Sequence, residues 1–296
     1  MTTYRAAVPA DQAGIYAVWS AAFTAPRLVP LYETDDGRFT RTFVAEGAEG
    51  AEKVEAVVYW LPRRLRTADG GSELVGGVAN VATLPAARGR GHIRSLLALA
   101  AESMTAAGCA WSLLFTGHPG VYEGSGWKVF RQRRVRGPLA APRVSPSSSS
   151  VRQASLAEWP LLAELYDRHN ASRPLSTVRT CDDWRQRVPL FYGAPVDLLL
   201  DEGSGYVAVR WHATSVELLE VAGHLPPLLS RVAAEAAGRG ITEGSARLTP
   251  DDPALPYLLA EAHVVHDTSG MARPLARDPS VTLNASNAVH WRADNF

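Results

Sequence analysis

The chemistry most readable in this sequence is anion binding, at the stretch RGRGHIR over residues 88–94, which follows a strand-like run and opens an amphipathic helix. Backbone N–H groups at the start of a helix have no partner within the helix, and together with the helix dipole they favour a bound anion. Gly89 and Gly91 let a ligand approach the main chain without a Cβ in the way. Charge-assisted donors come from three arginines, Arg88, Arg90 and Arg94. The stretch therefore predicts a phosphate-binding turn.

Two common phosphate-binding motifs do not fit this turn. A Walker loop would continue with GK[ST], which does not follow here. The dinucleotide fingerprint G-x-G-x-x-G does not fit either, because the turn follows a late strand and no acidic residue is suitably placed for a ribose. On its own, the turn leaves an ordinary exposed connection between a strand and a helix as the alternative.

The elements around the turn predict a strand–helix–strand crossover. A strand is expected over 74–84, a helix over 91–107 that stops at Gly108, and a second strand over 110–116. Such a crossover places two parallel strands side by side, here within a mixed sheet. The other elements expected in the first half are helices over 11–23 and 119–124, and strands near 41–45, 54–62 and 127–136.

The second half of the chain repeats the architecture of the first. Aligning Arg5 with Arg152 also matches Trp19 with Tyr166, and each segment reads as a short strand followed by an amphipathic helix. A tandem duplication explains this match, with chance similarity between two amphipathic helices as the alternative. The remaining elements, without a glycine–arginine turn, are strands over 196–201, 205–211, 215–221 and 244–248, and helices over 226–238 and 254–261.

These patterns predict an α/β protein with mixed sheets in two tandem domains. The first domain is expected over 1–139 and the second over 151–276, followed by a tail over 277–296. The segment AAPRVSPSSSS over 140–150 is expected to be a linker, because its Pro and Ser residues favour extended, solvated backbone.

Composition narrows the class of protein. Arg plus Lys equals Asp plus Glu at 30 each, so no net charge favours a nucleic-acid or membrane partner. Cys109 and Cys181 lie in different halves without zinc-ligand spacing, so neither a disulfide framework nor a metal is expected. The chain has no secretion-signal pattern and no apolar run near the roughly 20 residues that cross a bilayer. A cytoplasmic protein is therefore expected.

With this context, the turn resembles the signature [QR]-x-x-G-x-[GA] of the GCN5-related N-acetyltransferase (GNAT) superfamily, which holds the pyrophosphate of acetyl-CoA. Arg88 and Gly91 match, while Ile93 departs from the pattern. The enhanced-intracellular-survival (Eis-like) branch shares that departure, and its V-A-V-x-P-x-x-R-R-R-G-x-[LI]-R is similar to VATLPAARGRGHIR. The resemblance implies an acetyl-CoA site in which main-chain groups of Val81, Ala82 and Thr83 bind the pantetheine arm. It implies that the phosphates are held by Gly89, Arg90, Gly91, His92, Ile93 and Arg94, and Gly117 and His118 are assigned to the same site.

Two further segments are similar to this branch. GHPGVYEGSGWKVF resembles the segment that carries the general acid, which assigns this role to Tyr122. RTCDDWRQR resembles R-x-x-x-x-W-x-x-R through Arg179, Trp184 and Arg187. The branch has two GNAT-like domains, the second degenerate because it lacks the pyrophosphate loop, as expected here. The branch usually ends with a third, sterol-carrier-like domain. Too few residues follow Ala276 for such a domain, so it is expected to be absent or reduced to the tail.

Acetyl transfer to an amine makes three chemical demands. The amine must lose a proton, since a lysine-like ammonium has a pKa of about 10.4 and no lone pair. The developing oxyanion needs a donor, which a backbone N–H near Val81 supplies. The departing thiolate needs a proton, a task suited to the phenol of Tyr122. The alternative for Tyr122 is a half-buried side chain that packs over the sheet.

The general base is less defined by the sequence. His118 is one candidate relay, with a loop-capping histidine as the alternative, and an acidic rim or a solvated turn is expected at Glu33, Asp35 and Asp36. In the resembling branch the terminal carboxylate enters the first active site, which points to Phe296 as a group that orients or deprotonates the amine through water. A disordered terminus is the competing interpretation. Trp19, Phe23 and Trp60 are expected either to line an acceptor pocket or to fill the core.

The resemblance therefore implies an acetyl-CoA-dependent N-acetyltransferase that acts on a small-molecule or peptidyl primary amine by direct transfer in the N-terminal domain. Two alternatives stay open, a non-catalytic CoA-binding sensor or scaffold and an aminoacyl-tRNA-dependent peptidyl transferase. The neutral chain argues against the latter, since tRNA binding demands a basic face. The branch tends to assemble, so a homo-oligomer is also expected, and the sequence does not identify the acceptor amine.

Overall fold

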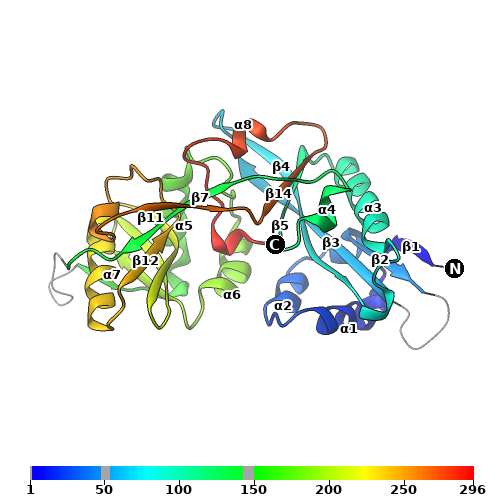
Figure 1. Cartoon of the computed structure of the whole chain (residues 1–296), viewed down its shortest axis with the longest axis horizontal. Coiled ribbons are helices and arrows are strands. Elements are labelled where there is room, and N and C mark those ends of the chain that lie inside the picture. The colour runs from blue at the N-terminus through cyan, green and yellow to red at the C-terminus, as the bar shows by residue number, and fades with distance from the viewer. Residues whose placement is uncertain (1, 48–53, 143–149) are drawn as a thin grey trace.

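The computed structural model describes residues 2–47, 54–142 and 150–296. Two seven-stranded sheets with flanking helices form two lobes, joined by strands that pass between them and by the C-terminal segment (Figure 1). The predicted α/β class with mixed sheets is therefore confirmed. No helix among the described residues is long and apolar enough to span a membrane.

The first sheet carries the predicted strand–helix–strand crossover. Its strand order is β1 (Thr3–Ala6), β2 (Thr42–Glu46), β3 (Val54–Arg66), β4 (Ser72–Thr83), β5 (Trp111–Phe115), β14 (Gly270–Pro274) and β6 (Lys128–Val129). The helices of this lobe are α1 (Gln12–Ala22), α2 (Leu28–Glu33), α3 (His92–Ala106) and α4 (Gly120–Glu123). β4 and β5 are parallel neighbours, as expected for the two strands that flank α3.

Alternation along β3 explains why helices cover both faces of this sheet. Val58 and Trp60 pack in the cluster formed with α3, whereas Val57 and Tyr59 pack in the cluster formed with α1 and α2. Successive side chains of a strand point to opposite faces. A strand with apolar side chains at both odd and even positions therefore needs helices on both faces of its sheet. The interior strand β3 has them.

The second sheet repeats the layered arrangement. Its strand order is β13 (His263–Asp267), β7 (Gln132–Pro138), β12 (Glu243–Ala246), β11 (Ser215–Gly223), β10 (Gly205–Trp211), β9 (Asp197–Asp201) and β8 (Val151–Gln153). Its main helices are α5 (Trp159–Asn170), α6 (Val188–Tyr192) and α7 (Pro226–Gly238). β11 leads directly into α7 with Pro226 and Pro227 at its start, so this lobe has no counterpart of the glycine–arginine turn.

The two sheets exchange strands, so the expected domain bounds 1–139 and 151–276 do not separate them. β7 comes from the first half yet pairs with β12 and β13, and β14 returns from the second half to pair with β5 and β6. The strand expected over 127–136 is accordingly divided into β6 and β7. The alternation of apolar and polar residues identifies a strand but not the strand with which it pairs. The exchange could therefore not be predicted from the sequence. Of the linker expected over 140–150, residues 143–149 lie outside the described residues.

The prediction of a helix over 254–261 is wrong. Only a single 3₁₀ turn, Leu255–Tyr257, forms there. Pro253 and Pro256 explain the difference, because proline has no N–H to donate and its ring clashes with the preceding turn of a helix. The apolar residues of this segment still pack into the core of the second lobe.

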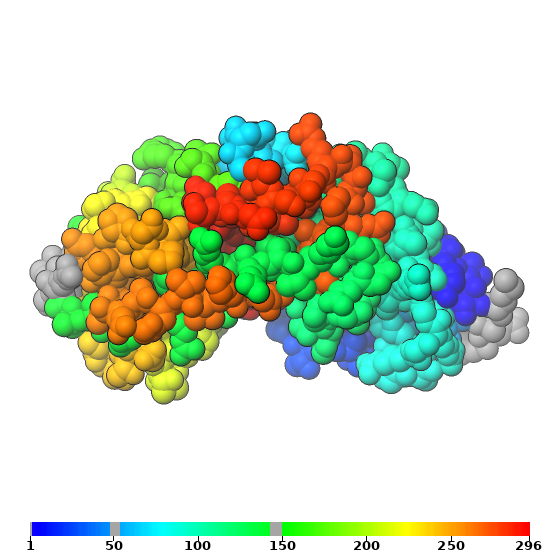
Figure 2. Space-filling model, turned by 45° about the horizontal axis from the view of Figure 1, so that its top comes forward, coloured from blue at the N-terminus to red at the C-terminus, as the bar shows by residue number. Residues whose placement is uncertain are grey.

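The C-terminal tail is docked rather than frayed. After α8 (Ser280–Leu283) the chain runs between the lobes and ends near the centre of the molecule, and Figure 2 shows it, in red, lying across both lobes. Trp291 is fully buried and its Nε1 donates to Asn170 Oδ1 at 2.8 Å. Asp294 is also fully buried. The competing interpretation of a disordered terminus does not describe this structure.

Candidate active site

A split between β4 and β5 opens the first cavity. The two strands pair only from Val75 to Gly77 with Trp111 to Leu113. Beyond that point β4 has a bulge, because Val57 pairs with Ala82 and Tyr59 with Ala79, so that Asn80 and Val81 lie opposite one residue of β3. Asn80 adopts a φ of +52° within this bulge. A bulge bends its strand, and here β4 diverges from β5 and leaves room for a ligand.

The cavity at this split has a volume of about 850 Å³ and is bounded by β4, the glycine–arginine turn, the end of β5 and α4. Every residue assigned to acetyl-CoA from the sequence lines it, together with Tyr122: Val81, Ala82, Thr83, Arg88, Gly89, Arg90, Gly91, His92, Ile93, Arg94, Gly117 and His118. The fold thus brings the ends of two strands, a turn and a short helix to one place.

The turn presents bare backbone to this cavity. Gly89 and Gly91 have φ values of +78° and +79°, and an added Cβ would meet nothing within 4 Å at either position. Glycine is therefore favoured at these two positions by the positive φ of the backbone, and not by a lack of space for a side chain. The first backbone bond of α3 runs from Ser95 N to Gly91 O at 3.3 Å. The N–H groups that precede Ser95 in the turn are thus oriented as donors for an anion, which fits the diphosphate of acetyl-CoA.

The side chains of the turn are not equally placed to bind the phosphates. Arg90 donates to Glu55 at 3.3 Å and to Ala86 O at 3.0 Å, so it braces the turn. The His92 ring is buried, with Nδ1 3.0 Å from the Tyr4 hydroxyl, so its side chain also supports the turn from within. Arg94 makes no ion pair with the described residues and lines the cavity, which leaves its guanidinium available to a ligand.

Tyr122 reaches the cavity from α4 as a neutral phenol. It is 8% exposed, and burial raises its pKa to about 12, with a hydrogen bond to Thr116 acting in the opposite direction. The hydroxyl therefore stays protonated near neutral pH and can donate a hydrogen bond. His118 lies exposed beside it, on the rim of the cavity, and its backbone N–H donates to Thr116 Oγ1 at 2.9 Å.

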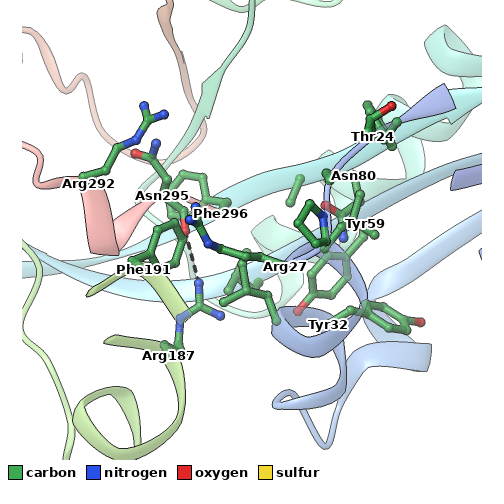
Figure 3. Close-up of a pocket in the computed structure, with 17 residues that line it drawn as sticks. Thr24, Arg27, Tyr32, Tyr59, Asn80, Arg187, Phe191, Arg292, Asn295 and Phe296 are labelled. Atoms are coloured by element: carbon green, nitrogen blue, oxygen red, sulfur yellow. Dashed lines mark hydrogen bonds between the residues drawn. The ribbon is translucent and has the colours of Figure 1, made fainter. Parts of the chain in front are cut away.

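A second cavity, of about 500 Å³, adjoins the first and shares Phe23, Ala79 and Asn80 with it. Its walls come from the α1–α2 region, from β3 and β4, from the second lobe and from the tail (Figure 3). The sequence did not identify this cavity, because no local motif spans four separate segments. The lining residues that it left unassigned include Arg27, Tyr32, Tyr59, Phe191, Arg292 and Asn295.

The aromatic and acidic residues expected near an acceptor have different roles. Phe23 lines both cavities, whereas Trp60 packs in the core under α3. Trp19 is buried and its Nε1 donates to Asn80 O at 2.9 Å, which supports the bulge. Of the expected acidic rim, Glu33 accepts from the Tyr16 hydroxyl and Asp35 from the Tyr59 hydroxyl, and neither lines the second cavity.

Comparison with known proteins identifies the first domain. Residues 3–130 match the family model of the acetyltransferase (GNAT) domain. This segment is therefore similar to a GNAT domain. No curated protein matches the sequence. The superfamily resemblance of the turn at 88–94 is thus confirmed.

Solved GNAT structures share the fold of nearly the whole chain. Over 93% of this chain, a GCN5-related N-acetyltransferase from Kribbella flavida superposes with a TM-score of 0.72 at 20% identity, covering 71% of that chain. Eis1 from Mycobacterium abscessus superposes over the same share with a TM-score of 0.65 at 18% identity, covering 74% of that chain. The expected tandem GNAT-like fold of the Eis-like type is therefore confirmed.

The tail of this GNAT-fold protein ends in the wall of the second cavity. An added Cβ on Gly77 would lie 2.5 Å from the ring of Phe296, so the ring packs directly on β4. The Phe296 ring also lies 6.0 Å from that of Phe115, centroid to centroid. Arg187 donates to Asn295 O at 3.2 Å. The terminus is thus held at the split between the strands.

The motif R-x-x-x-x-W-x-x-R acquires a structural explanation, because two of its residues hold the tail. Arg179 Nε donates to Asp294 Oδ1 at 2.8 Å, and the guanidinium stacks over the Trp184 ring at 4.8 Å. Arg187 binds the next residue of the tail.

As for a metal, the described residues contain no cluster of three or more His, Cys, Asp or Glu side chains that could hold an ion.

Proposed function

We propose that the protein transfers the acetyl group of acetyl-CoA to a primary amine, with the donor in the cavity of the GNAT domain and the amine in the cavity between the lobes. The observation that carries this proposal is the junction of the two cavities at Phe23, Ala79 and Asn80. At this junction β4 has left β5, so its backbone groups are available to a thioester. The glycine–arginine turn and Tyr122 flank the same donor cavity.

Each group of residues has one task in this proposal. The backbone of the turn binds the diphosphate, and Val81 to Thr83 bind the pantetheine arm and donate an N–H to the thioester oxygen as charge develops there. Tyr122 donates its hydroxyl proton, or a hydrogen bond, to the departing sulfur. The carboxylate of Phe296 orients the amine or accepts its proton through a water molecule. Bound acetyl-CoA supplies the activated acyl group.

Calorimetry with acetyl-CoA tests the donor site, and Gly91→Val is the decisive variant. A β-branched residue does not adopt a φ near +79° without strain, so the turn must reorganise and its N–H groups leave the phosphates. We expect acetyl-CoA affinity to fall at least about tenfold, since hydrogen bonds to a charged group are worth about 1.5–3 kcal/mol.

The matched control is Gly108→Val, at the opposite end of the same helix. Gly108 also has a φ of +79° with nothing within 4 Å of an added Cβ, so the backbone strain is the same. This variant should lose stability but keep its affinity for acetyl-CoA. The donor site is refuted if the unaltered protein releases no heat with acetyl-CoA, or if both variants bind it equally well.

Gly77→Ala tests the position of the tail. The new Cβ would meet three ring atoms of Phe296 at 2.5–2.7 Å, so the ring must move. We expect kcat to fall about tenfold, because displacing a catalytic group by about 1 Å costs up to about 100-fold in rate. Acetyl-CoA affinity should stay unchanged, which calorimetry measures beside the thiol-release rate.

Gly76→Ala controls for this change on the other face of β4. There the added Cβ would meet the Met104 side chain at 2.5 Å, far from the tail. Equal loss of kcat in both variants would remove the tail from the mechanism. Appending a few residues after Phe296 then tests the carboxylate itself, and unaffected turnover would exclude it.

A further inference from the structure

The cavity between the lobes is positively charged. Three of its lining residues are arginines, namely Arg27, Arg187 and Arg292, and no Asp or Glu side chain is among its described lining residues. They come from three separate parts of the chain, the α1–α2 region, the second lobe and the tail. The fold therefore concentrates positive charge in a cavity that the sequence alone, with its balanced net charge, does not reveal.

These arginines are incompletely neutralised by the protein. Within the described residues neither Arg27 nor Arg292 forms an ion pair, and Arg27 lies over the Phe191 ring at 5.5 Å. Arg187 is 7% exposed and shares Asp183, at 3.7 Å, with Arg63. The buried Nε of Arg187 has no hydrogen-bond partner among the described residues.

Mutual repulsion accompanies this arrangement. Burial lowers the pKa of Arg27, and the charges of Arg210 and Arg292 lower it further. Burial, with the charge of Arg63, lowers the pKa of Arg187 to about 10. Within the described residues no ion pair joins any of these arginines to the terminal carboxylate of Phe296, although Phe296 lines the same cavity. A bound anion would relieve this repulsion.

Apolar side chains form much of the remaining wall. Leu28, Leu31, Leu61 and Phe191 line the cavity beside the ring of Phe296. In Figure 3 Asn80, at the junction with the donor cavity, lies at one end, whereas Arg187, Arg292 and Asn295 lie at the other. A ligand that spans the cavity would therefore place its amine near Asn80, its apolar part along the leucines and its anion near the arginines.

We propose that the acceptor is an amine that also carries a carboxylate and an apolar body, such as an apolar amino acid or a short apolar peptide. Guanidinium groups bind carboxylates through paired, charge-assisted hydrogen bonds. The same charges repel polycationic amines. This inference rests on the proposed function, because it concerns the acceptor of that reaction.

Acetyl transfer to such an amine needs no further reactant. In the transfer, the nitrogen lone pair forms a bond to the acyl carbon and the carbon–sulfur bond breaks with its electron pair going to sulfur. The amine loses one proton and the thiolate gains one, giving the amide and free CoA.

Matched compounds test the carboxylate. Turnover is measured by thiol release for leucine, phenylalanine and leucylphenylalanine, for the C-terminal amide of each, and for spermidine. Binding is measured separately by calorimetry with the N-acetylated products and their amides, in the presence of CoA. We expect each carboxylate to exceed its amide at least about tenfold, in kcat/KM and in affinity, since a charged hydrogen bond is lost in the amide.

Two variants locate the effect. Arg27→Gln and Arg292→Gln should each reduce the preference for the carboxylate at least about fivefold, chiefly through KM, and should leave acetyl-CoA affinity unchanged. Both side chains are partly exposed, so neither change leaves a buried carboxylate unpaired. Arg168→Gln removes one positive charge from an exposed position on α5 and should change nothing.

The outcomes separate this inference from the proposed function. Absence of heat with acetyl-CoA refutes the donor site but does not affect the binding of carboxylates. Amides that match the carboxylates in binding overturn the inference, as does spermidine that matches them in turnover. A carboxylate preference that survives both arginine variants also overturns it. A phosphate-bearing amine that binds more tightly than every carboxylate would overturn the assignment of the anion.

Discussion

Replacing Tyr122 by phenylalanine is expected to lower kcat about 100-fold or more, while acetyl-CoA affinity stays within twofold. General acid catalysis contributes about 10²–10⁴-fold, and the variant removes the only atom of Tyr122 that can donate to sulfur. The ring keeps its place, because it packs in the core cluster of the first lobe. Thiol release measures the rate and calorimetry measures the affinity.

The ionisation of Tyr122 sharpens this prediction. Because burial raises its pKa to about 12, the phenol is protonated throughout the range near neutral pH. The pH profile of kcat below about pH 9 should therefore show no ionisation that disappears in Tyr122→Phe. An ionisation near pH 7 that does disappear would contradict the neutral phenol described by the structure.

Tyr16→Phe is the matched control, since it makes the same chemical change outside both cavities. Its hydroxyl donates to Glu33 at 2.9 Å, so a small effect on stability is expected and none on kcat. If Tyr122→Phe keeps kcat within threefold, Tyr122 is not the acid. If the unaltered protein binds acetyl-CoA but acetylates no amine, a CoA-binding sensor explains the fold better than an enzyme.

Replacing Arg179 by methionine is expected to destabilise the protein by about 3–5 kcal/mol, the cost of leaving buried charges without their partner. The Arg179 side chain is fully buried between the carboxylates of Glu220 and Asp294. Glu220 also accepts from the hydroxyls of Tyr192 and Tyr206, at 2.8 and 2.5 Å. Unfolding in urea, followed by tryptophan fluorescence, measures the change.

Arg168→Met is the control for this variant. Its ion pair with Glu164 lies on the surface of α5, where both side chains are more than 60% exposed. Pairs of this kind are worth about 0.3–0.5 kcal/mol, so stability should hardly change. A loss of less than 1 kcal/mol for Arg179→Met would show that the buried network is not needed to hold the tail between the lobes.

The sequence by itself determined the glycine–arginine turn and the elements that flank it. All its parts are contiguous in the chain: the strand before it, Gly89, Gly91 and the helix up to Gly108. Left-handed glycines and the start of an amphipathic helix are local properties, so residue type and spacing are sufficient to predict them. Tyr122 was found in the same way, within one short segment that resembles a known motif.

Only the tertiary structure decided how the halves are joined and what forms the second cavity. The exchange of β7 and β14 depends on which strands meet in space, and the alternating pattern of a strand is the same in either sheet. Arg27, Arg187 and Arg292 are separated by about a hundred residues or more, so no local pattern connects them. Their convergence is a property of long-range packing, and the positive cavity between the lobes follows from it.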